Sequence, residues 1–200
     1  MSMNILVAGA TGTTGLQLVQ DLVDQGYTPT ALVRESSDTS ELPKGVNLRH
    51  GDLTELQSGV CDGMDAVIFA AGSGGSTGPE MTDKVDRDGA KRLVDLAVES
   101  GVSRFVMLSS VGAGQSNPEG DLAHYLKAKH EADEHLKASG LTYAILRPVA
   151  LTNDGHSDAV ILGEKVDKRA NASRADVAHL LAEAVTTGRF DGMALNMQSA

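Results

Sequence analysis

The sequence predicts an α/β fold: a single domain built on a doubly wound parallel sheet with helices on both faces. Three observations support this prediction. Short apolar runs alternate with longer segments in which apolar residues recur at helical spacing. The chain has 200 residues, enough to bury one sizeable core. Small and polar residues follow most of the apolar runs, which is where ligands meet the strand ends of such a sheet.

The first apolar run, residues 5–8, reads Ile-Leu-Val-Ala and predicts a buried parallel strand. Gly9, Gly12 and Gly15 follow it in the spacing G-x-x-G-x-x-G, and apolar residues then recur at helical spacing. Strand, glycine loop and helix in this order form a place to bind a phosphate. Glycine lets backbone N–H groups approach the anion, and the helix N-terminus adds partial positive charge.

Three further strands are expected in the first half of the chain, each predicted from a short run of residues. Pro29 stands near the start of the first of them, where its missing N–H is tolerated. Gly72 follows the last one, and the segment 72–79 that it opens is either a flexible lid or a long turn. The expected strands are 30–33, 46–50 and 66–71.

Helices and strands alternate in the second half. Asp86, Arg87 and Asp88 are expected to form the solvated start of a helix. Ser173 is expected to cap the last helix, with Asp176 favourable in its first turn. Glycines after the first two helices and Arg-Pro after one strand mark where these elements end. The expected helices are 82–100, 122–139 and 174–185, and the expected strands are 105–108, 142–146 and 194–197.

Composition and charge exclude several classes of function. The net charge of −10 argues against general nucleic-acid binding. No run of about 18 apolar residues occurs, so no membrane span is expected. Cys61 is the only cysteine, and the first strand follows the N-terminus directly, so we expect a cytoplasmic protein without disulfides. The expected partner is a small-molecule substrate, and the sequence leaves the oligomeric state open.

The end of the second strand indicates which dinucleotide binds. Arg34 follows this strand and is expected over the adenine ribose, where a guanidinium pairs well with a 2′-phosphate. Ser36 and Ser37 can add hydroxyl donors. This pattern favours NADP over NAD. If the Glu35 carboxylate faces the ribose instead, NAD is preferred.

A second group of residues predicts proton transfer. Tyr125 and Lys129 are four positions apart on an expected helix, hence on one face. A neighbouring ammonium stabilises the phenolate form of a tyrosine, which makes it usable as an acid or base. Ser109 and Ser110 end the preceding strand, and a serine hydroxyl there can hold a substrate oxygen. We therefore expect Ser110, Tyr125 and Lys129 to be catalytic.

With these motifs in place, the sequence resembles the short-chain dehydrogenase/reductase superfamily. More narrowly, it is similar to the atypical NAD(P)H-binding group that includes NmrA-like proteins and the biliverdin-IXβ and flavin reductases. The resemblance implies a Rossmann fold. The motifs that carry it occur in the family's order over nearly the whole chain, at 9–15, 32–34, 51–53, 69–72, 105–110, 124–129, 141–148 and 173–178.

The resemblance also implies roles for individual residues. The glycine-loop residues contact the pyrophosphate, Asp52 and Leu53 flank the adenine, and Lys129 bonds the nicotinamide ribose. Pro148 and Val149 lie near the nicotinamide ring. The full expected cofactor set is Gly9, Thr11, Gly12, Thr13, Thr14, Gly15, Arg34, Ser36, Ser37, Asp52, Leu53, Ala70, Ala71, Gly72, Ser109, Lys129, Pro148 and Val149.

The function expected from the sequence is an NADP(H)-dependent oxidoreductase acting on a small carbonyl, quinone, flavin or tetrapyrrole. The alternatives are a catalytically silent NADP(H)-sensing regulator and a sugar-nucleotide epimerase, the latter disfavoured because few residues follow Pro148. Residues 149–172 are expected to form a small substrate-loop region. Its polar segment 153–158 matches no standard metal-site spacing, and no metal is expected. His124, His130 and His135 are expected to be exposed, with only His124 near the pocket.

Overall fold

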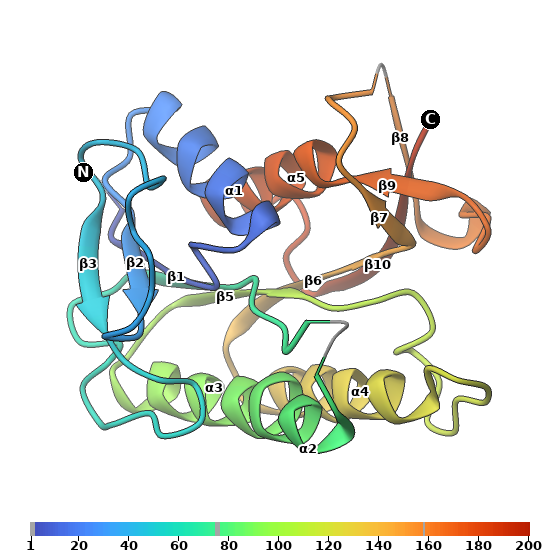
Figure 1. The fold of residues 1–200 in the computed structure, drawn as a ribbon, viewed down its shortest axis with the longest axis horizontal. Coiled ribbons are helices and arrows are strands. Elements are labelled where there is room, and N and C mark those ends of the chain that lie inside the picture. The colour runs from blue at the N-terminus through green and yellow to red at the C-terminus, as the bar shows by residue number, and fades with distance from the viewer. Residues whose placement is uncertain (1–2, 75–76, 158) are drawn as a thin grey trace.

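An eight-stranded sheet forms the centre of the molecule, with the strand order β3-β2-β1-β4-β5-β6-β10-β8 (Figure 1). The computed structural model describes residues 3–74, 77–157 and 159–200. Every neighbouring pair in the sheet is parallel except β10 and β8. The strands are β1 (Ile5–Ala8), β2 (Thr30–Val33), β3 (Asn47–His50), β4 (Ala66–Phe69), β5 (Arg104–Leu108), β6 (Thr142–Pro148), β8 (Val160–Leu162) and β10 (Met193–Ser199).

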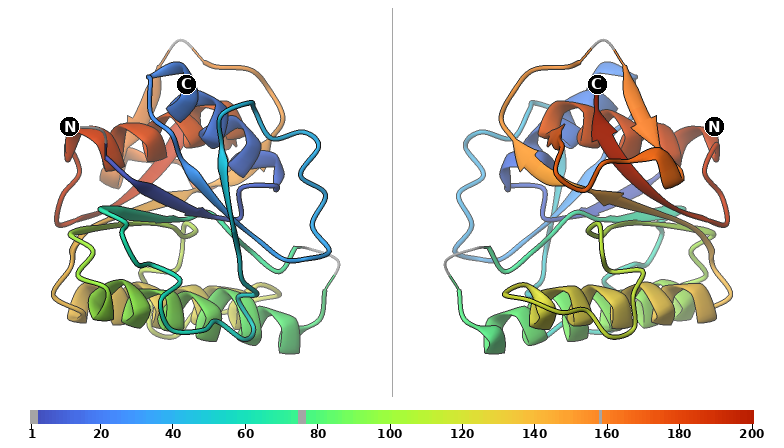
Figure 2. Two further views of the ribbon diagram at one scale, coloured as in Figure 1. Left: turned by 90° about the vertical axis from the view of Figure 1, so that its left-hand side faces the viewer. Right: turned by 90° about the vertical axis from the view of Figure 1, so that its right-hand side faces the viewer.

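Helices cover both faces of the sheet, as Figure 2 shows in edge views. One face carries α1 and α5, and the other carries α4 and the continuous helix made of α2, η1 and α3. This is the doubly wound arrangement expected from the sequence. The helices are α1 (Thr13–Asp24), α2 (Pro79–Thr82), η1 (Asp83–Gly89), α3 (Ala90–Glu99), α4 (Ala123–Ala138), the single-turn η2 (Gly163–Lys165) and α5 (Arg174–Thr187).

The core consists of two apolar layers, one on each face of the sheet. Successive side chains of a strand point to opposite faces. Ile5 and Val7 therefore pack with the residues of α1 and α5, whereas Leu6 and Ala8 pack with those of α3 and α4. All four residues are fully buried. Among the described residues, no helix has both the length and the apolar content that a membrane crossing requires.

The helix expected over 82–100 differs from the prediction in two respects. It begins earlier, at Pro79, and its second segment, η1, is a π-helix of seven residues. Gly89 ends that segment, and a Cβ atom there would lie 2.7 Å from the Leu53 carbonyl oxygen. Asp86, expected in solvent, is fully buried inside η1. That expectation was wrong because the carboxylate has a buried cationic partner on another helix, Lys129.

The region after β6 contains more regular structure than expected. β6 runs to Pro148, two residues beyond its expected end, with the Pro148 carbonyl accepting the Val111 N–H at 2.9 Å. Two short strands, β7 (Ala150–Thr152) and β9 (Asn171–Ser173), pair in parallel beside the main sheet. β8 pairs antiparallel with β10 and forms one edge of the main sheet. These three-residue strands are too short to show periodicity in the sequence.

Candidate cofactor and active site

The three glycines of the loop after β1 differ in whether the fold itself requires them. Gly9 has a φ of +84°, and a Cβ there would lie 2.6 Å from the Ala71 nitrogen. A Cβ at Gly15 would collide with the Gly9 carbonyl oxygen. Gly12 is exposed, and its nearest protein atom to such a Cβ is the Gly9 oxygen at 3.3 Å. The fold therefore needs Gly9 and Gly15, whereas the bare backbone at Gly12 faces open space that a ligand can occupy.

The first turn of α1 is available to an anion. Gly12 is the N-cap and offers no side-chain cap, and the first turn contains no acidic residue. The N–H groups of Thr13, Thr14 and Gly15 have no hydrogen-bond partner in the described part of the chain. Free N–H donors and the positive end of the helix dipole together fit a phosphate. A dinucleotide pyrophosphate therefore suits this loop.

The turn after β2 holds Arg34 with its guanidinium free. The Ser37 hydroxyl accepts the Arg34 N–H at 3.1 Å, and the Ser37 N–H donates to the Arg34 carbonyl at 3.0 Å. The Arg34 side chain is exposed and forms no hydrogen bond or ion pair with the residues that the structure describes. Ser36 is exposed on the same turn. Glu35 is turned toward β3, where its carboxylate lies 3.2 Å from Nδ1 of His50.

The expected adenine and ribose contacts lie at the ends of β3 and β4. Asp52 accepts hydrogen bonds from the Thr54 N–H and hydroxyl, both at 2.8 Å. These bonds, with a smaller contribution from the Arg34 charge, lower the pKa of the Asp52 carboxyl. Leu53 is partly buried beside it. After β4, the Ala70 N–H donates to the Ala8 carbonyl at 2.9 Å, which places 70–72 against the glycine loop.

The structure brings Tyr125 and Lys129 together on one face of α4, as the spacing predicted. The Lys129 ammonium lies 5.8 Å from the centre of the Tyr125 ring and 5.6 Å from that of Phe69. It donates to the Leu108 carbonyl at 3.3 Å and pairs with Asp86 at 3.0 Å. Lys129 is only 2% exposed. The sequence anticipated the face of α4 and did not anticipate the carboxylate opposite it.

The two serines after β5 have separate environments. The Ser109 hydroxyl is buried and donates to Oδ2 of Asp133 at 2.9 Å. Arg147, at the end of β6, donates from Nε to the same oxygen at 2.9 Å. Ser110 is partly exposed, and its hydroxyl makes only a 3.3 Å bond to the Val111 carbonyl. Ser110 is therefore the serine whose hydroxyl can turn toward a ligand, whereas the Ser109 hydroxyl is engaged inside the protein.

Pro148 and Val149 lie where the polypeptide leaves β6 for the substrate-loop region. Both residues are buried, and the Val149 N–H donates to the Met197 carbonyl at 3.1 Å. Their place at the carboxyl end of a central strand is the place where ligands bind in such sheets. Their contact with a nicotinamide stays a prediction, as do the ligand contacts of the other site residues.

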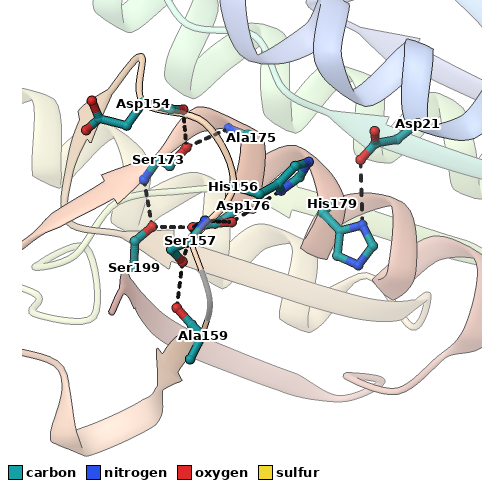
Figure 3. A network of polar contacts seen from close by, with 10 residues as sticks. All are labelled: Asp21, Asp154, His156, Ser157, Ala159, Ser173, Ala175, Asp176, His179 and Ser199. Atoms are coloured by element: carbon teal, nitrogen blue, oxygen red, sulfur yellow. Dashed lines mark hydrogen bonds and ion pairs between the residues drawn. The ribbon is translucent and has the colours of Figure 1, made fainter.

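A polar network holds the substrate-loop region against α5 (Figure 3). Asp176, 4% exposed, accepts hydrogen bonds from the Ser157 N–H at 3.1 Å and from the hydroxyls of Ser157 and Ser199. Burial by itself raises the pKa of the Asp176 carboxyl, but these hydrogen bonds outweigh it and lower the pKa. Ser173 caps α5 as expected, accepting the Ala175 N–H. Of the expected polar segment 153–158, residue 158 lies outside the described residues.

The three histidines of α4 all contact protein groups. His124 is exposed as expected, and its Nε2 lies 2.9 Å from Asp83 of η1. His135 and His130 are only partly exposed, which differs from the expectation. The His130 ring nitrogen lies 2.8 Å from the Ala113 carbonyl, and His135 lies 2.6 Å from Asp95 on α3. These contacts connect α4 to its neighbours.

Comparison with known proteins assigns the chain to a family. Residues 9–188 match the model of an NAD(P)H-binding family. The "Uncharacterized sugar epimerase YhfK" of Bacillus subtilis is 38% identical over 184 residues, covering 88% of this chain and 85% of that protein.

Two solved structures are similar over nearly the whole chain. A "putative NAD-dependent epimerase/dehydratase" of Bacillus halodurans has a TM-score of 0.92 and 33% identity, covering 100% of this chain and 95% of that one. The "oxidoreductase ylbE" of Lactococcus lactis has a TM-score of 0.86 and 30% identity, covering 99% and 91%. Together with the glycine loop, the Rossmann order of strands and the free N-terminus of α1, these matches confirm the resemblance stated from the sequence: the chain belongs to the NAD(P)H-binding family.

Proposed function

We propose that this protein is an NADP(H)-dependent oxidoreductase that reduces a small carbonyl, quinone, flavin or tetrapyrrole. One observation carries the proposal. The anion-binding turn at Gly12 and the Tyr125–Lys129 pair follow strands of one parallel sheet, at their carboxyl ends. A dinucleotide bound along that edge would reach from the Gly12 turn to the Tyr125–Lys129 pair. The nicotinamide supplies the hydride, and the protein supplies binding, orientation and proton management.

The preference for NADP rests on the turn after β2. Arg34 is the free cation there, and a guanidinium recognises a phosphate by charge-assisted, bidentate hydrogen bonds. Glu35, the residue that would favour NAD, has its carboxylate on His50 instead. The Asp52 carboxylate is engaged with Thr54. The 2′-phosphate of NADP therefore has a partner at this turn, and the arrangement of carboxylates favours it over a ribose hydroxyl.

We assign proton transfer to Tyr125, with Lys129 and Ser110, at the end of the site where the nicotinamide would lie. Tyr125 is partly exposed, with the Lys129 ammonium near its ring, so its phenol can donate a proton to an acceptor oxygen or nitrogen. Lys129 stabilises the phenolate left behind, because it remains charged in its buried position. Ser110 orients the acceptor through its loosely held hydroxyl.

A second candidate is sugar epimerisation, because one similar protein is named a sugar epimerase and another an epimerase/dehydratase. Both are close to this chain in length, since it covers 85% of one and 95% of the other. The short C-terminal region therefore does not by itself exclude such a reaction. An epimerase of this kind would oxidise and re-reduce one substrate with no net consumption of NADPH, whereas a reductase consumes it continuously.

The deciding experiment is a screen for NADPH oxidation with quinones, flavins, aldehydes and linear tetrapyrroles. We expect steady oxidation with one class. With that acceptor, Tyr125→Phe should slow turnover by about 10²–10⁴-fold and leave NADPH affinity nearly unchanged, because it removes one acid and little packing. Tyr27→Phe is the matched control, since Tyr27 precedes the amino end of β2, whereas the proposed site lies at the carboxyl ends of the strands. Tight NADPH binding with no NADPH oxidation would contradict the reductase and support the sensing or the epimerase alternative instead.

A further inference from the structure

The carboxylate of Asp86 connects two segments of the nicotinamide end. Its Oδ1 lies 3.0 Å from the Lys129 ammonium, and its Oδ2 accepts the Ser73 N–H at 3.0 Å. Ser73 belongs to the chain that leaves β4 toward α2, and the Ser73 hydroxyl also lies 3.2 Å from that of Thr82. Asp86 and Lys129 are both buried almost completely. One side chain thus holds both the lysine and the backbone after β4.

The backbone around Asp86 is closely packed and holds its carboxylate near Lys129 and Ser73. Asp86 lies within η1, and π-helical turns inside α-helices frequently occur at functional sites. η1 packs so closely on the segment after β3 that only glycine fits at position 89. At Gly72, a Cβ would lie 3.3 Å from Oδ1 of Asp86. The helix, the Gly72 backbone and the lysine therefore approach the carboxylate from three sides.

Lys129 is held by two contacts and keeps one donor. An ammonium has three N–H groups. The Leu108 carbonyl accepts one of them, and Asp86 attracts the ammonium as an ion pair at 3.0 Å. Among the described residues, the ammonium forms no further hydrogen bond, which leaves a donor for a hydroxyl of the nicotinamide ribose. The direction of that donor depends on the position of Asp86.

The ionisable groups around Lys129 favour its protonated form. Burial by itself lowers the pKa of the Lys129 ammonium, but the Tyr125 and Asp86 groups outweigh it and the pKa is raised. Asp133, the other carboxylate that acts on Lys129, is paired with Arg147 at 2.9 Å. Asp86 is therefore the carboxylate assigned to Lys129 by direct contact.

We propose that Asp86 is a positioning residue of the cofactor site, which holds the Lys129 ammonium toward the nicotinamide ribose and fixes the backbone at Ser73 with its second oxygen. The proposal rests on the proposed function for the role of Lys129. It adds a residue that lies in a different helix and does not itself touch the reacting atoms.

The first test measures Lys129 directly, without cofactor. Carbon-13 labelling of the lysine ε-carbons reports each ammonium by NMR, and Lys129→Arg identifies the resonance. In the wild-type protein we expect Lys129 to titrate above the exposed lysines. In Asp86→Asn, which keeps the shape and removes the charge, we expect Lys129 to titrate lower than in the wild type, since one of the groups that offset burial is gone. A wild-type Lys129 that titrates at or below the exposed lysines overturns the proposal, and this measurement needs no folded Asp86 variant.

The second test measures NADPH binding by calorimetry from about pH 7 to about pH 10. Wild-type affinity should be flat over this range. For Asp86→Asn the dissociation constant should rise by up to about tenfold per pH unit above the new lysine pKa, because binding then requires uptake of a proton. A purely structural role for Asp86 would not create this pH profile. Asp88→Asn is the matched control: it is exposed, lies in the same segment and pairs with Arg87.

The outcomes separate this proposal from the proposed function. If Asp86→Asn shows the pH-dependent loss but no acceptor is reduced by the wild-type protein, the reductase assignment fails and the positioning role stands. If an acceptor is reduced and Asp86→Asn binds NADPH with wild-type affinity and a flat pH profile, the positioning role fails and the reductase assignment stands.

Discussion

At the scale of single residues, the glycine loop contains a position where the fold excludes a side chain and a position where only a bound cofactor would exclude it. Gly15→Ala should destabilise the protein, because its Cβ collides with the Gly9 carbonyl. Gly12→Val should leave a folded protein, since the nearest atom to its Cβ is 3.3 Å away, but should abolish NADPH binding. Thermal unfolding and calorimetry of the two variants give these results separately. Full NADPH affinity in a folded Gly12→Val protein would place the phosphates elsewhere.

Arg34 gives a second prediction at this scale, for cofactor choice. Arg34→Ala should weaken NADPH binding about tenfold to a hundredfold and change NADH binding little, because only NADPH loses a charge-assisted hydrogen bond of about 1.5–3 kcal/mol. Titration of both cofactors by calorimetry checks this. Arg169→Ala is a suitable control, since its side chain is 92% exposed in the C-terminal region. Equal losses for the two cofactors would contradict the NADP assignment.

At the scale of elements, Asp176 attaches the substrate-loop region and the end of β10 to the start of α5. Its folded-state pKa lies below the ordinary value, so the hydrogen bonds stabilise the protein above about pH 4 and the stabilisation is lost as the pH falls further. Asp176→Asn should therefore cost about 1.5–3 kcal/mol at pH 7 and lose less stability than wild type on acidification. Denaturant unfolding at about pH 7, 4 and 3 measures this. Exposed Glu164, changed to Gln, is the control, and parallel pH curves for Asp176→Asn and wild type would refute the assignment.

The elements also show what could be predicted from the sequence. β1, its glycine loop and the shared face of Tyr125 and Lys129 were predictable because their patterns are local. The burial of Asp86 was not, since a carboxylate beside Arg87 and Asp88 reads as a polar helix surface. Only the fold brings Lys129 to it. β7 and β9 likewise form through pairing with each other across the chain, and three residues carry no periodic signal.

At the scale of the whole molecule, a cofactor that binds only the folded chain should raise its melting temperature. NADPH at about one hundred times its dissociation constant contributes about 2.7 kcal/mol, which corresponds to roughly 5–10 °C for a domain of this size. Differential scanning fluorimetry with NADPH and NADH measures the shift, and Gly12→Val should show none. The absence of a shift in wild-type protein with either cofactor would count against the whole site.

The order of strands has a further consequence for how copies of the chain behave at high concentration. Unpaired strand edges are templates on which other chains can add, and short or charged edges suppress this. The outer strands here are β8, with three residues, and β3, with four. β3 carries Arg49, which is bound to the Val60 and Asp62 carbonyls, and His50, which pairs with Glu35. Both ends of the sheet are therefore poor templates, and the buried strands between them are kept out of fibrillar, edge-to-edge growth.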